Sequence, residues 1–303
     1  MKRRLFRGTG VALITPFQKD GSVDDRKLRE LVEFQITSGT EAILPAGTTG
    51  ESATLSHAEH HQVMEIVLDQ ANHRVPVIVG AGSNSTREAI SLTVHAKSIG
   101  ADGVLSVAPY YNKPTQEGFY QHYAAIASAV DIPIVVYNVP GRTGANINAE
   151  TTLRMAEEIP NVVAAKEASG NIPQIMEILR CKPDDFAVYS GDDNLAFTVV
   201  SLGGDGIVSV IANQVPKMFG DMVRHCLAGD LENARKLHYK LLPLMNANFI
   251  ESNPIPVKAT LAMMGMIEEV YRLPLVSPTE ATRAKLRKVL RELELLHETV
   301  GTK

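Results

Sequence analysis

The feature that most constrains the fold of this 303-residue chain is a short apolar run followed by a helical pattern, repeated eight times. The runs are rich in β-branched residues and bounded by Gly, Pro or Asn, which is typical of buried parallel strands. The predicted strands are 9–14, 42–46, 76–79, 103–107, 133–137, 162–169, 186–190 and 206–210. Because an open sheet more often stops at five to seven strands, eight of them predict an α/β fold of the closed (β/α)8 type, a TIM barrel.

The strand pattern stops near residue 216, and the remaining sequence has helical periodicity. A helix is indicated over 231–244, with a further one toward the C-terminus. No linker of biased composition separates the two parts of the chain. We therefore predict a catalytic barrel over 1–220 and a C-terminal helical appendage over 221–303 that packs on it.

Three Ser-x-x-Glu patterns mark expected helix starts. Ser56-x-x-Glu59 and Ser85-x-x-Glu88 follow the second and third predicted strands, and Ser277-x-x-Glu280 precedes the last helical pattern. In a capping box the serine and the glutamate each bind a free backbone N–H of the first turn. Each pattern therefore predicts a helix that begins next to its serine.

Charge and cysteine content exclude several classes of function. The net charge of −4 provides no basic field for nucleic acid or for an anionic membrane surface. No apolar run is long enough to span a bilayer, and the basic start of the chain lacks the apolar segment of a signal peptide. Cys181 and Cys226 are the only cysteines and lie far apart, so we expect neither a disulfide nor a zinc site. A reducing cytoplasm is the expected location.

Lys166 is unusual because it lies within a predicted buried strand. An ammonium group without a partner is costly to desolvate, so a buried lysine tends to lose its proton and becomes a nucleophile toward carbonyl carbons. Taken alone, the position fits a structural lysine that reaches solvent or pairs with Glu167. The residues at the ends of the other predicted strands favour the nucleophilic role over the structural one.

The carboxyl ends of the predicted strands gather the groups that imine chemistry needs, and active sites of such barrels lie there. The residues at these ends are Thr48, Thr49, Tyr110, Tyr111, Tyr137, Arg142, Lys166, Gly191 and Val208. A Schiff-base aldolase requires an amine for a keto acid, hydroxyls that move protons and an arginine for a carboxylate. Backbone N–H groups of the turn over 47–50 are expected to bind the substrate carboxylate.

Five motifs carry a resemblance to a known family. They are Gly-Thr-Thr-Gly-Glu-Ser over 47–52, Pro-Tyr-Tyr-Asn-Lys-Pro over 109–114, Tyr-Asn-Val-Pro-Gly-Arg-Thr-Gly over 137–144, Lys-Glu-Ala-Ser-Gly over 166–170 and Ser-Gly-Asp-Asp over 190–193. With these motifs the chain resembles the dihydrodipicolinate synthase (4-hydroxy-tetrahydrodipicolinate synthase) family from end to end. The resemblance implies condensation of pyruvate with L-aspartate-4-semialdehyde, on the route to lysine and diaminopimelate.

The resemblance also implies catalytic roles. Lys166 would form the imine with pyruvate, so no further cofactor is expected. Tyr137 would donate and accept protons in a relay with Thr48 and with Tyr111, the latter reaching across from a neighbouring subunit. A shared tyrosine implies at least a dimer, and the family suggests a homotetramer built as a dimer of dimers.

The remaining positions concern substrate binding. By resemblance Thr49 and Val208 would contact pyruvate, Gly191 would be a further substrate-binding position, and Arg142 would hold a carboxylate at the site entrance. Arg142 also argues against an N-acetylneuraminate-type sugar-acid lyase, whose polyhydroxylated substrates need hydroxyl-binding groups at this place. That lyase and a non-catalytic barrel that binds keto acids remain the alternatives. A phosphosugar isomerase is disfavoured because Asp192 and Asp193 would repel a phosphate.

A regulatory site is the last expectation from the sequence. By resemblance to bacterial members that bind lysine at a dimer interface, the effector residues would be Ser52, Ala53, His57, His60, Asn84, Glu88 and Tyr110. Glu88 would pair with the α-amino group, and we expect moderate feedback inhibition by L-lysine. His57, His60 and His61 also suggest a metal site, since two histidines at positions i and i+3 can share a helix face. No third ligand is evident for such a pair, so we expect histidines on the helix surface and no metal.

Overall fold

The computed structural model of the protein describes residues 4–296, in which eight parallel strands form one sheet in the order β2-β1-β8-β7-β6-β5-β4-β3. The strands are β1 (Gly8–Ala12), β2 (Ala42–Leu44), β3 (Ile78–Gly80), β4 (Gly103–Val107), β5 (Ile134–Asn138), β6 (Val162–Glu167), β7 (Ala187–Ser190) and β8 (Gly206–Ser209). Backbone hydrogen bonds close the sheet between its edge strands, from Ile43 N to the Pro76 carbonyl (3.0 Å) and from Gly80 N to the Pro45 carbonyl (2.9 Å). The predicted barrel is therefore confirmed.

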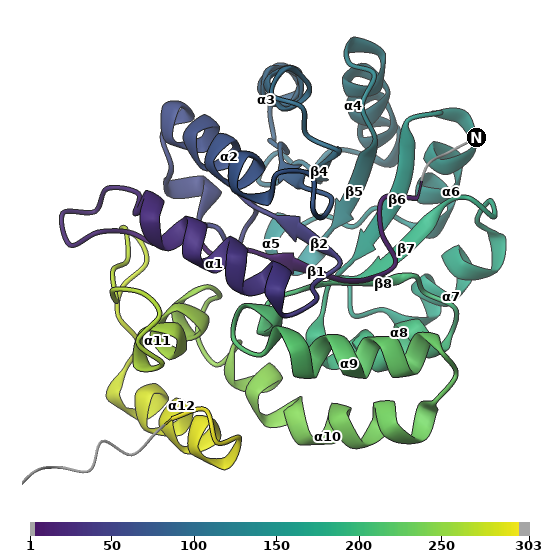
Figure 1. Cartoon of the computed structure of the whole chain (residues 1–303). Helices are drawn as coiled ribbons and strands as arrows, with labels where there is room; N and C mark the ends of the chain where they lie inside the picture. The colour runs from purple at the N-terminus through teal and green to yellow at the C-terminus, as the bar shows by residue number, and fades with distance from the viewer. Residues whose placement is uncertain (1–3, 297–303) are drawn as a thin grey trace, which may run out of the picture.

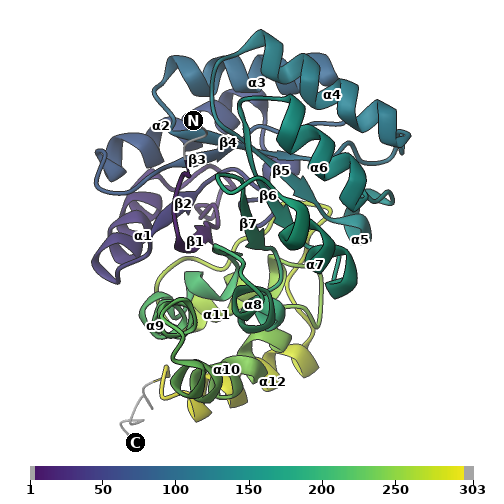
Figure 2. The same ribbon diagram turned by 90° about the vertical axis from the view of Figure 1, so that its right-hand side faces the viewer.

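Helices surround the strands on the outside of the barrel, and the C-terminal helices gather at one side of it (Figure 1, Figure 2). They are α1 (Asp25–Thr37), α2 (His57–Ala71), α3 (Thr86–Ser98), α4 (Gln116–Ala129), α5 (Pro140–Thr143), α6 (Ala149–Glu158), α7 (Ile172–Cys181), α8 (Ala196–Ser201), α9 (Pro216–Leu227), α10 (Leu231–Ala247), α11 (Ile255–Met263) and α12 (Glu280–Glu292). Short 3-10 turns occupy Ser52–Thr54, Asp193–Leu195 and Ile211–Asn213. Over residues 4–296, none of these helices has the length and apolar character that crossing a bilayer requires.

The helix caps agree only in part with the three Ser-x-x-Glu patterns. Ser56 and Glu59 form the predicted capping box at the start of α2. Ser85 is the N-cap residue of α3, so this helix begins where it was predicted, but the Ser85 side chain makes no capping hydrogen bond and the predicted box is absent. The last helix begins two residues later than predicted, because the Thr279 side chain, not that of Ser277, caps α12 by accepting a hydrogen bond from Thr282 N.

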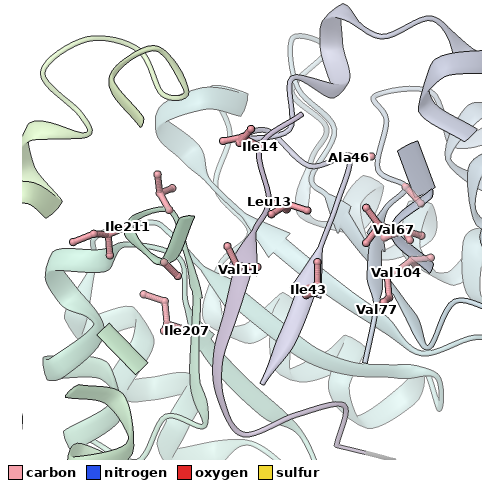
Figure 3. Packing of buried hydrophobic residues seen from close by; sticks show 14 of the residues in the cluster. Val11, Leu13, Ile14, Ile43, Ala46, Val67, Val77, Val104, Ile207 and Ile211 are labelled. Atoms are coloured by element: carbon pink, nitrogen blue, oxygen red, sulfur yellow. The ribbon is translucent and has the colours of Figure 1, made fainter. Parts of the chain in front are cut away.

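Two apolar clusters hold the barrel together. The larger one lies between the strands and the surrounding helices, and Figure 3 shows Val11, Ile43 and Ile207 of this cluster on neighbouring strands. The smaller cluster fills the inside of the barrel, where the Phe6 ring stacks on Tyr189 with 4.2 Å between ring centres. Since side chains alternate along each strand, one set faces the helices and the other faces the interior, where the site lies.

The C-terminal region begins within a barrel helix. The predicted division at residue 220 falls inside α9, and α9 packs against β1. Helices α10, α11 and α12 follow, with α10 packed on α9 and α12 packed on α11. The barrel helices therefore extend through Leu227, and α10–α12 are the additional part.

Candidate active site

The carboxyl ends of the strands enclose an inner cavity of about 50 Å³. Six residues of the predicted site line it, namely Thr48, Thr49, Tyr137, Arg142, Lys166 and Gly191. The same lining includes Asp192, Phe249 and Asn253, which the sequence did not single out as site residues. The barrel thus brings together most of the side chains that were expected at the strand ends.

Lys166 lies inside the barrel because of its register in the sheet. It is paired with Tyr137 of β5, and in-register neighbours of parallel strands point to the same face. Its Nζ lies 4.1 Å from the centre of the Tyr137 ring. Glu167, the next residue, points to the opposite face, where its carboxylate accepts hydrogen bonds from Asn138 Nδ2 (2.9 Å) and Ser169 Oγ (2.6 Å). The structure therefore excludes an ion pair between Lys166 and Glu167.

Burial changes the protonation of the Lys166 amine. The side chain is 5% exposed, and desolvation lowers its pKa to about 8, helped by the charge of Arg142 and opposed by Asp192 and Asp193. At pH 7 about a tenth of the molecules then carry a neutral amine, which is the nucleophilic form. The environment of Lys166 thus suits attack on a ketone.

Tyr137 provides a hydroxyl next to this amine. Its ring is buried, and desolvation raises the pKa of the phenol to about 12, while Arg142 and a hydrogen bond with the Thr48 side chain partly offset the rise. The phenol is therefore neutral near pH 7 and can both donate and accept a proton. Thr48 and Tyr137 both line the inner cavity, and their predicted proton relay stays a prediction.

The turn that follows β2 supplies donors for an anion. Ser52 N donates to the Gly47 carbonyl (3.2 Å), which closes the turn. The backbone N–H groups of Thr48 and Thr49 donate to no group within residues 4–296. The Thr49 hydroxyl accepts a hydrogen bond from Asn253 Nδ2 (2.9 Å) and is thereby fixed in position. Free N–H groups beside a buried amine form a suitable cradle for a carboxylate.

Gly191 leaves the space that the lysine side chain occupies. A Cβ at this position would lie 3.1 Å from Lys166 Cε and 2.5 Å from Ala168 Cβ. Contacts this short require a shift of one of these groups, so a side chain here would displace Lys166 or the neighbouring backbone. Gly191 therefore shapes the cavity through its lack of a side chain.

An outer cavity of about 460 Å³ adjoins the inner one and shares Thr48, Val139, Arg142 and Asn253 with it. Arg142 Nη2 donates to the backbone carbonyl of Asn253 (3.2 Å), so the guanidinium stands at the junction of the two cavities. This is the place where the sequence predicted an arginine at the site entrance.

Six of the seven predicted effector residues line the outer cavity, namely Ser52, Ala53, His57, His60, Glu88 and Tyr110. Asn84 does not line it, and its carbonyl accepts a hydrogen bond from Asn112 Nδ2 (2.9 Å). Glu88 accepts a hydrogen bond from the Ser83 hydroxyl and lies 3.3 Å from His57 Nε2. The carboxylate of Glu88 therefore faces a cavity large enough for an amino acid.

The three histidines of α2 have separate surroundings. His60 is buried, unlike the surface position expected for it, and its Nε2 lies 2.7 Å from the Gly80 carbonyl. Desolvation lowers its pKa. His61 stacks on His95 with 3.6 Å between ring centres. Among residues 4–296 no group of three or more His, Cys, Asp or Glu side chains is placed to hold a metal ion.

Two of the predicted catalytic and substrate-binding residues lie outside the lining of both cavities. Tyr111 is 89% exposed in this single chain and has a left-handed backbone (φ 71°), and it lines neither cavity. Its predicted role in a neighbouring subunit stays a prediction. Val208 is wholly buried in the inner cluster, and the cavity is instead lined by Val210, two residues further on.

Asp192 and Asn253 are the polar lining residues that the sequence analysis missed. Asp192 stands directly after Gly191 at the end of β7, so its place at a strand end was a usable signal. Asn253 comes from the segment between α10 and α11, in the predicted appendage. No pattern in the sequence connects that segment with the strand ends.

Comparisons with known proteins agree with this geometry. A family model described as the dihydrodipicolinate synthetase family matches residues 5–293. The 4-hydroxy-tetrahydrodipicolinate synthase of Chloroherpeton thalassium is 56% identical over 296 residues, which is 98% of each chain. The chloride-inhibited dihydrodipicolinate synthase of Acinetobacter baumannii, solved in complex with pyruvate, has a TM-score of 0.94 and 48% identity, covering 96% of this chain and 99% of the other. The enzyme of Cyanidioschyzon merolae with lysine bound has a TM-score of 0.94 and 43% identity, covering 97% of this chain and all of the other. The chain belongs to the dihydrodipicolinate synthetase family.

Proposed function

We propose that the chain condenses pyruvate with L-aspartate-4-semialdehyde to give 4-hydroxy-tetrahydrodipicolinate, in the biosynthesis of lysine and diaminopimelate. The observation that carries this proposal is the Lys166 amine, buried inside the barrel with its pKa lowered to about 8 and its Nζ 4.1 Å from the centre of the Tyr137 ring. The relatives described above support the choice of substrates, because they are dihydrodipicolinate synthases and the chain matches them over nearly their whole length.

The first half of the reaction uses Lys166, Tyr137 and Thr48. The neutral amine attacks the ketone carbon of pyruvate, and the resulting carbinolamine loses water to form a protonated imine. The Tyr137 phenol, which lines the inner cavity with Thr48, gives its proton to the departing hydroxyl, which leaves as water, and the phenolate takes up the methyl proton that is lost when the enamine forms. The pyruvate carboxylate is placed on the free N–H groups of Thr48 and Thr49. Loss of a methyl proton then gives the enamine.

The second half joins the two substrates. The enamine carbon attacks the aldehyde carbon of the semialdehyde, and a proton moves to the new alkoxide. Arg142 at the junction of the cavities binds the carboxylate of this second substrate by charge-assisted hydrogen bonds. Water then releases the condensed product from Lys166 and regenerates the amine. All these steps use groups of the chain itself, so we infer that no cofactor beyond the imine is needed.

A direct assay tests this function. Purified protein is incubated with pyruvate and L-aspartate-4-semialdehyde, and the product is identified by mass spectrometry, with Lys166→Ala as the matched control. We expect product only with the wild-type chain, and we expect borohydride with pyruvate to add mass at Lys166. Cleavage of N-acetylneuraminate without formation of the condensation product would instead support the sugar-acid lyase. Absence of both activities and of the adduct would support a keto-acid-binding barrel.

L-Lysine is proposed as an effector that binds in the outer cavity. The relative from Cyanidioschyzon merolae has lysine bound, and the Glu88 carboxylate lines this cavity beside His57. An α-ammonium group would find a partner in Glu88. Titration of the condensation rate with lysine tests this, with Glu88→Gln as the variant that should lose inhibition. Full activity in millimolar lysine would contradict the proposal.

A homotetramer in the cytoplasm completes the proposal. Tyr111 supports an assembly, because an aromatic side chain that is 89% exposed is a suitable contact for a second copy. Both cysteines are free, which fits a reducing compartment. Analytical ultracentrifugation measures the assembly, and a monomer that keeps full activity would contradict a catalytic role for a partner's tyrosine.

A further inference from the structure

Two neighbouring aspartates after β7 have different surroundings. The Asp193 carboxylate has its hydrogen-bond partners within the protein, since it accepts hydrogen bonds from Ser209 Oγ (2.7 Å) and Ile211 N (2.9 Å). Asp192 is held only by its backbone: its N–H donates to Ser190 Oγ (3.3 Å), and its carbonyl accepts from the same hydroxyl (3.0 Å). Although Asp192 occupies the N-cap position of a 3-10 turn, its side chain makes no capping bond. Its carboxylate accepts no hydrogen bond within residues 4–296.

This free carboxylate lies on the wall of the inner cavity. The charged residues on that wall are Lys166, Arg142 and Asp192. Desolvation raises the pKa of Asp192, and the positive charge of Lys166 opposes the rise. A partly buried carboxylate without a hydrogen-bond donor is costly, so a cationic ligand at this wall would be bound favourably.

The charges that remain after imine formation indicate which ligand fits. With the proposed function, the lysine amine is bonded to pyruvate, and the pyruvate carboxylate lies on the turn after β2. Arg142 and Asp192 are then left, one positive and one negative, on the wall of the same cavity. The second substrate carries an α-carboxylate and an α-ammonium group at one carbon. Its charges therefore match the two residues.

Asn253 adds a second acceptor. It is 5% exposed and lines both cavities. Its Nδ2 is used by Thr49, and its backbone carbonyl by Arg142. Its side-chain oxygen Oδ1 is buried without a partner. Buried acceptors are rarely left unsatisfied, which indicates a ligand donor at this point. An ammonium group carries three N–H donors, enough for Asp192 and Asn253 together.

We propose that Asp192, assisted by Asn253 Oδ1, binds the α-ammonium group of the amino-aldehyde substrate while Arg142 binds its α-carboxylate. The inference rests on the proposed function and adds the residues that recognise the amino group. It predicts that the protein distinguishes L-aspartate-4-semialdehyde from succinate semialdehyde, which has the same chain length and carboxylate but no amino group. Asp192 thereby acts as a specificity-determining residue.

The test compares Asp192→Asn with the wild type on both aldehydes. The substitution removes the charge and keeps the shape of the side chain. Because succinate semialdehyde cannot give a cyclic product, the rate is measured as pyruvate consumed, by lactate dehydrogenase and NADH in quenched samples. We expect kcat/KM for the amino aldehyde to fall roughly 10- to 100-fold, the size typical of one lost charge-assisted hydrogen bond. For succinate semialdehyde we expect little change. Borohydride trapping of pyruvate alone serves as the control for an intact Lys166.

Each other outcome overturns the inference. An equal loss for both aldehydes, with or without lost trapping, would mean that Asp192 acts through the lysine or the fold. No loss for either would mean that it binds no substrate group. If Asp192→Asn does not accumulate as folded protein, the ratio of the wild-type kcat/KM values for the two aldehydes decides. The inference requires this ratio to favour the amino aldehyde by at least about tenfold. Equal kcat/KM values for both aldehydes contradict it. A wild-type chain that consumes pyruvate with neither aldehyde refutes the proposed function itself, which is a separate result.

Discussion

The buried position of Lys166 makes a quantitative prediction about pH. The amine attacks only when it is neutral, and its pKa is lowered by burial to about 8. The reactive fraction therefore rises with pH, by about tenfold per unit well below the pKa, and levels off above it. At pH 7 about one amine in ten is neutral, against roughly one in three thousand for an ordinary lysine. Burial thus raises the reactive fraction by about 300-fold.

A rapid-mixing experiment separates imine formation from later steps. Enzyme and pyruvate are mixed at a series of pH values from 6 to 10 and aged for short times. Each sample is then quenched into excess borohydride at one fixed pH, so that the reduction step is the same for all. The fraction of protein with added mass gives the rate of imine formation, for which we expect a midpoint near pH 8 and a plateau above it. The Tyr137 phenol, with its pKa raised to about 12, stays neutral over this range and does not distort the profile.

Two variants act as controls for this profile. Lys166→Ala should give no adduct at any pH, because the nucleophile is gone. Asp192→Asn should move the midpoint to lower pH, since the negative charge of Asp192 raises the pKa of Lys166. A wild-type rate that still rises tenfold per pH unit between pH 9 and 10 would refute the reasoning, because Lys166 would then titrate like an exposed lysine. An adduct on a different lysine would refute it as well.

Three further substitutions test other parts of the site. Lys258→Met leaves the wholly buried Glu51 carboxylate without its ion-pair partner. Urea unfolding should therefore show a free energy of unfolding lower by about 3–5 kcal/mol, and the second substitution Glu51→Gln should restore more than half of this loss. An unchanged unfolding midpoint for Lys258→Met would contradict this expectation. Gly191→Ala places a methyl group 3.1 Å from Lys166 Cε, and it should slow pyruvate trapping at least about tenfold while costing only about 1–3 kcal/mol of stability. Arg142→Ala should raise KM for the semialdehyde by roughly 10- to 100-fold. It should slow trapping of pyruvate much less, because the charge of Arg142 is only a secondary cause of the lowered pKa of Lys166; equal loss of both would mean that Arg142 acts on the first substrate.

The strands and the residues at their ends were predictable because they follow from local patterns. A run such as Val162–Glu167 has the composition of a buried strand, and its end is fixed by the residues that follow. Once eight such runs are counted, the barrel places Lys166 and Tyr137 at one end of the fold. Their register, and hence the 4.1 Å between the amine and the ring centre, required the structure.

Other features depend on contacts between segments that are distant in sequence. Glu88 has the spacing of a capping box with Ser85, yet its carboxylate binds the Ser83 hydroxyl and lies 3.3 Å from His57 Nε2. His60 looked like a surface residue of an amphipathic helix, but its ring is buried against the Gly80 carbonyl. In both cases a contact with another segment decided the position of a polar side chain, and local pattern carries no information on it.

The C-terminal region shows the same limit most clearly. By sequence it is an appendage, yet Phe249 and Asn253 line the inner cavity, and Lys258 of α11 reaches Glu51, which follows directly after the turn that carries the free N–H groups. Both side chains of this ion pair are 0% exposed. Breaking a buried pair leaves an uncompensated charge, at a cost of several kcal/mol. The turn therefore cannot separate from α11 without that cost, which makes the C-terminal segment a structural wall of the site as well as a cover of the barrel.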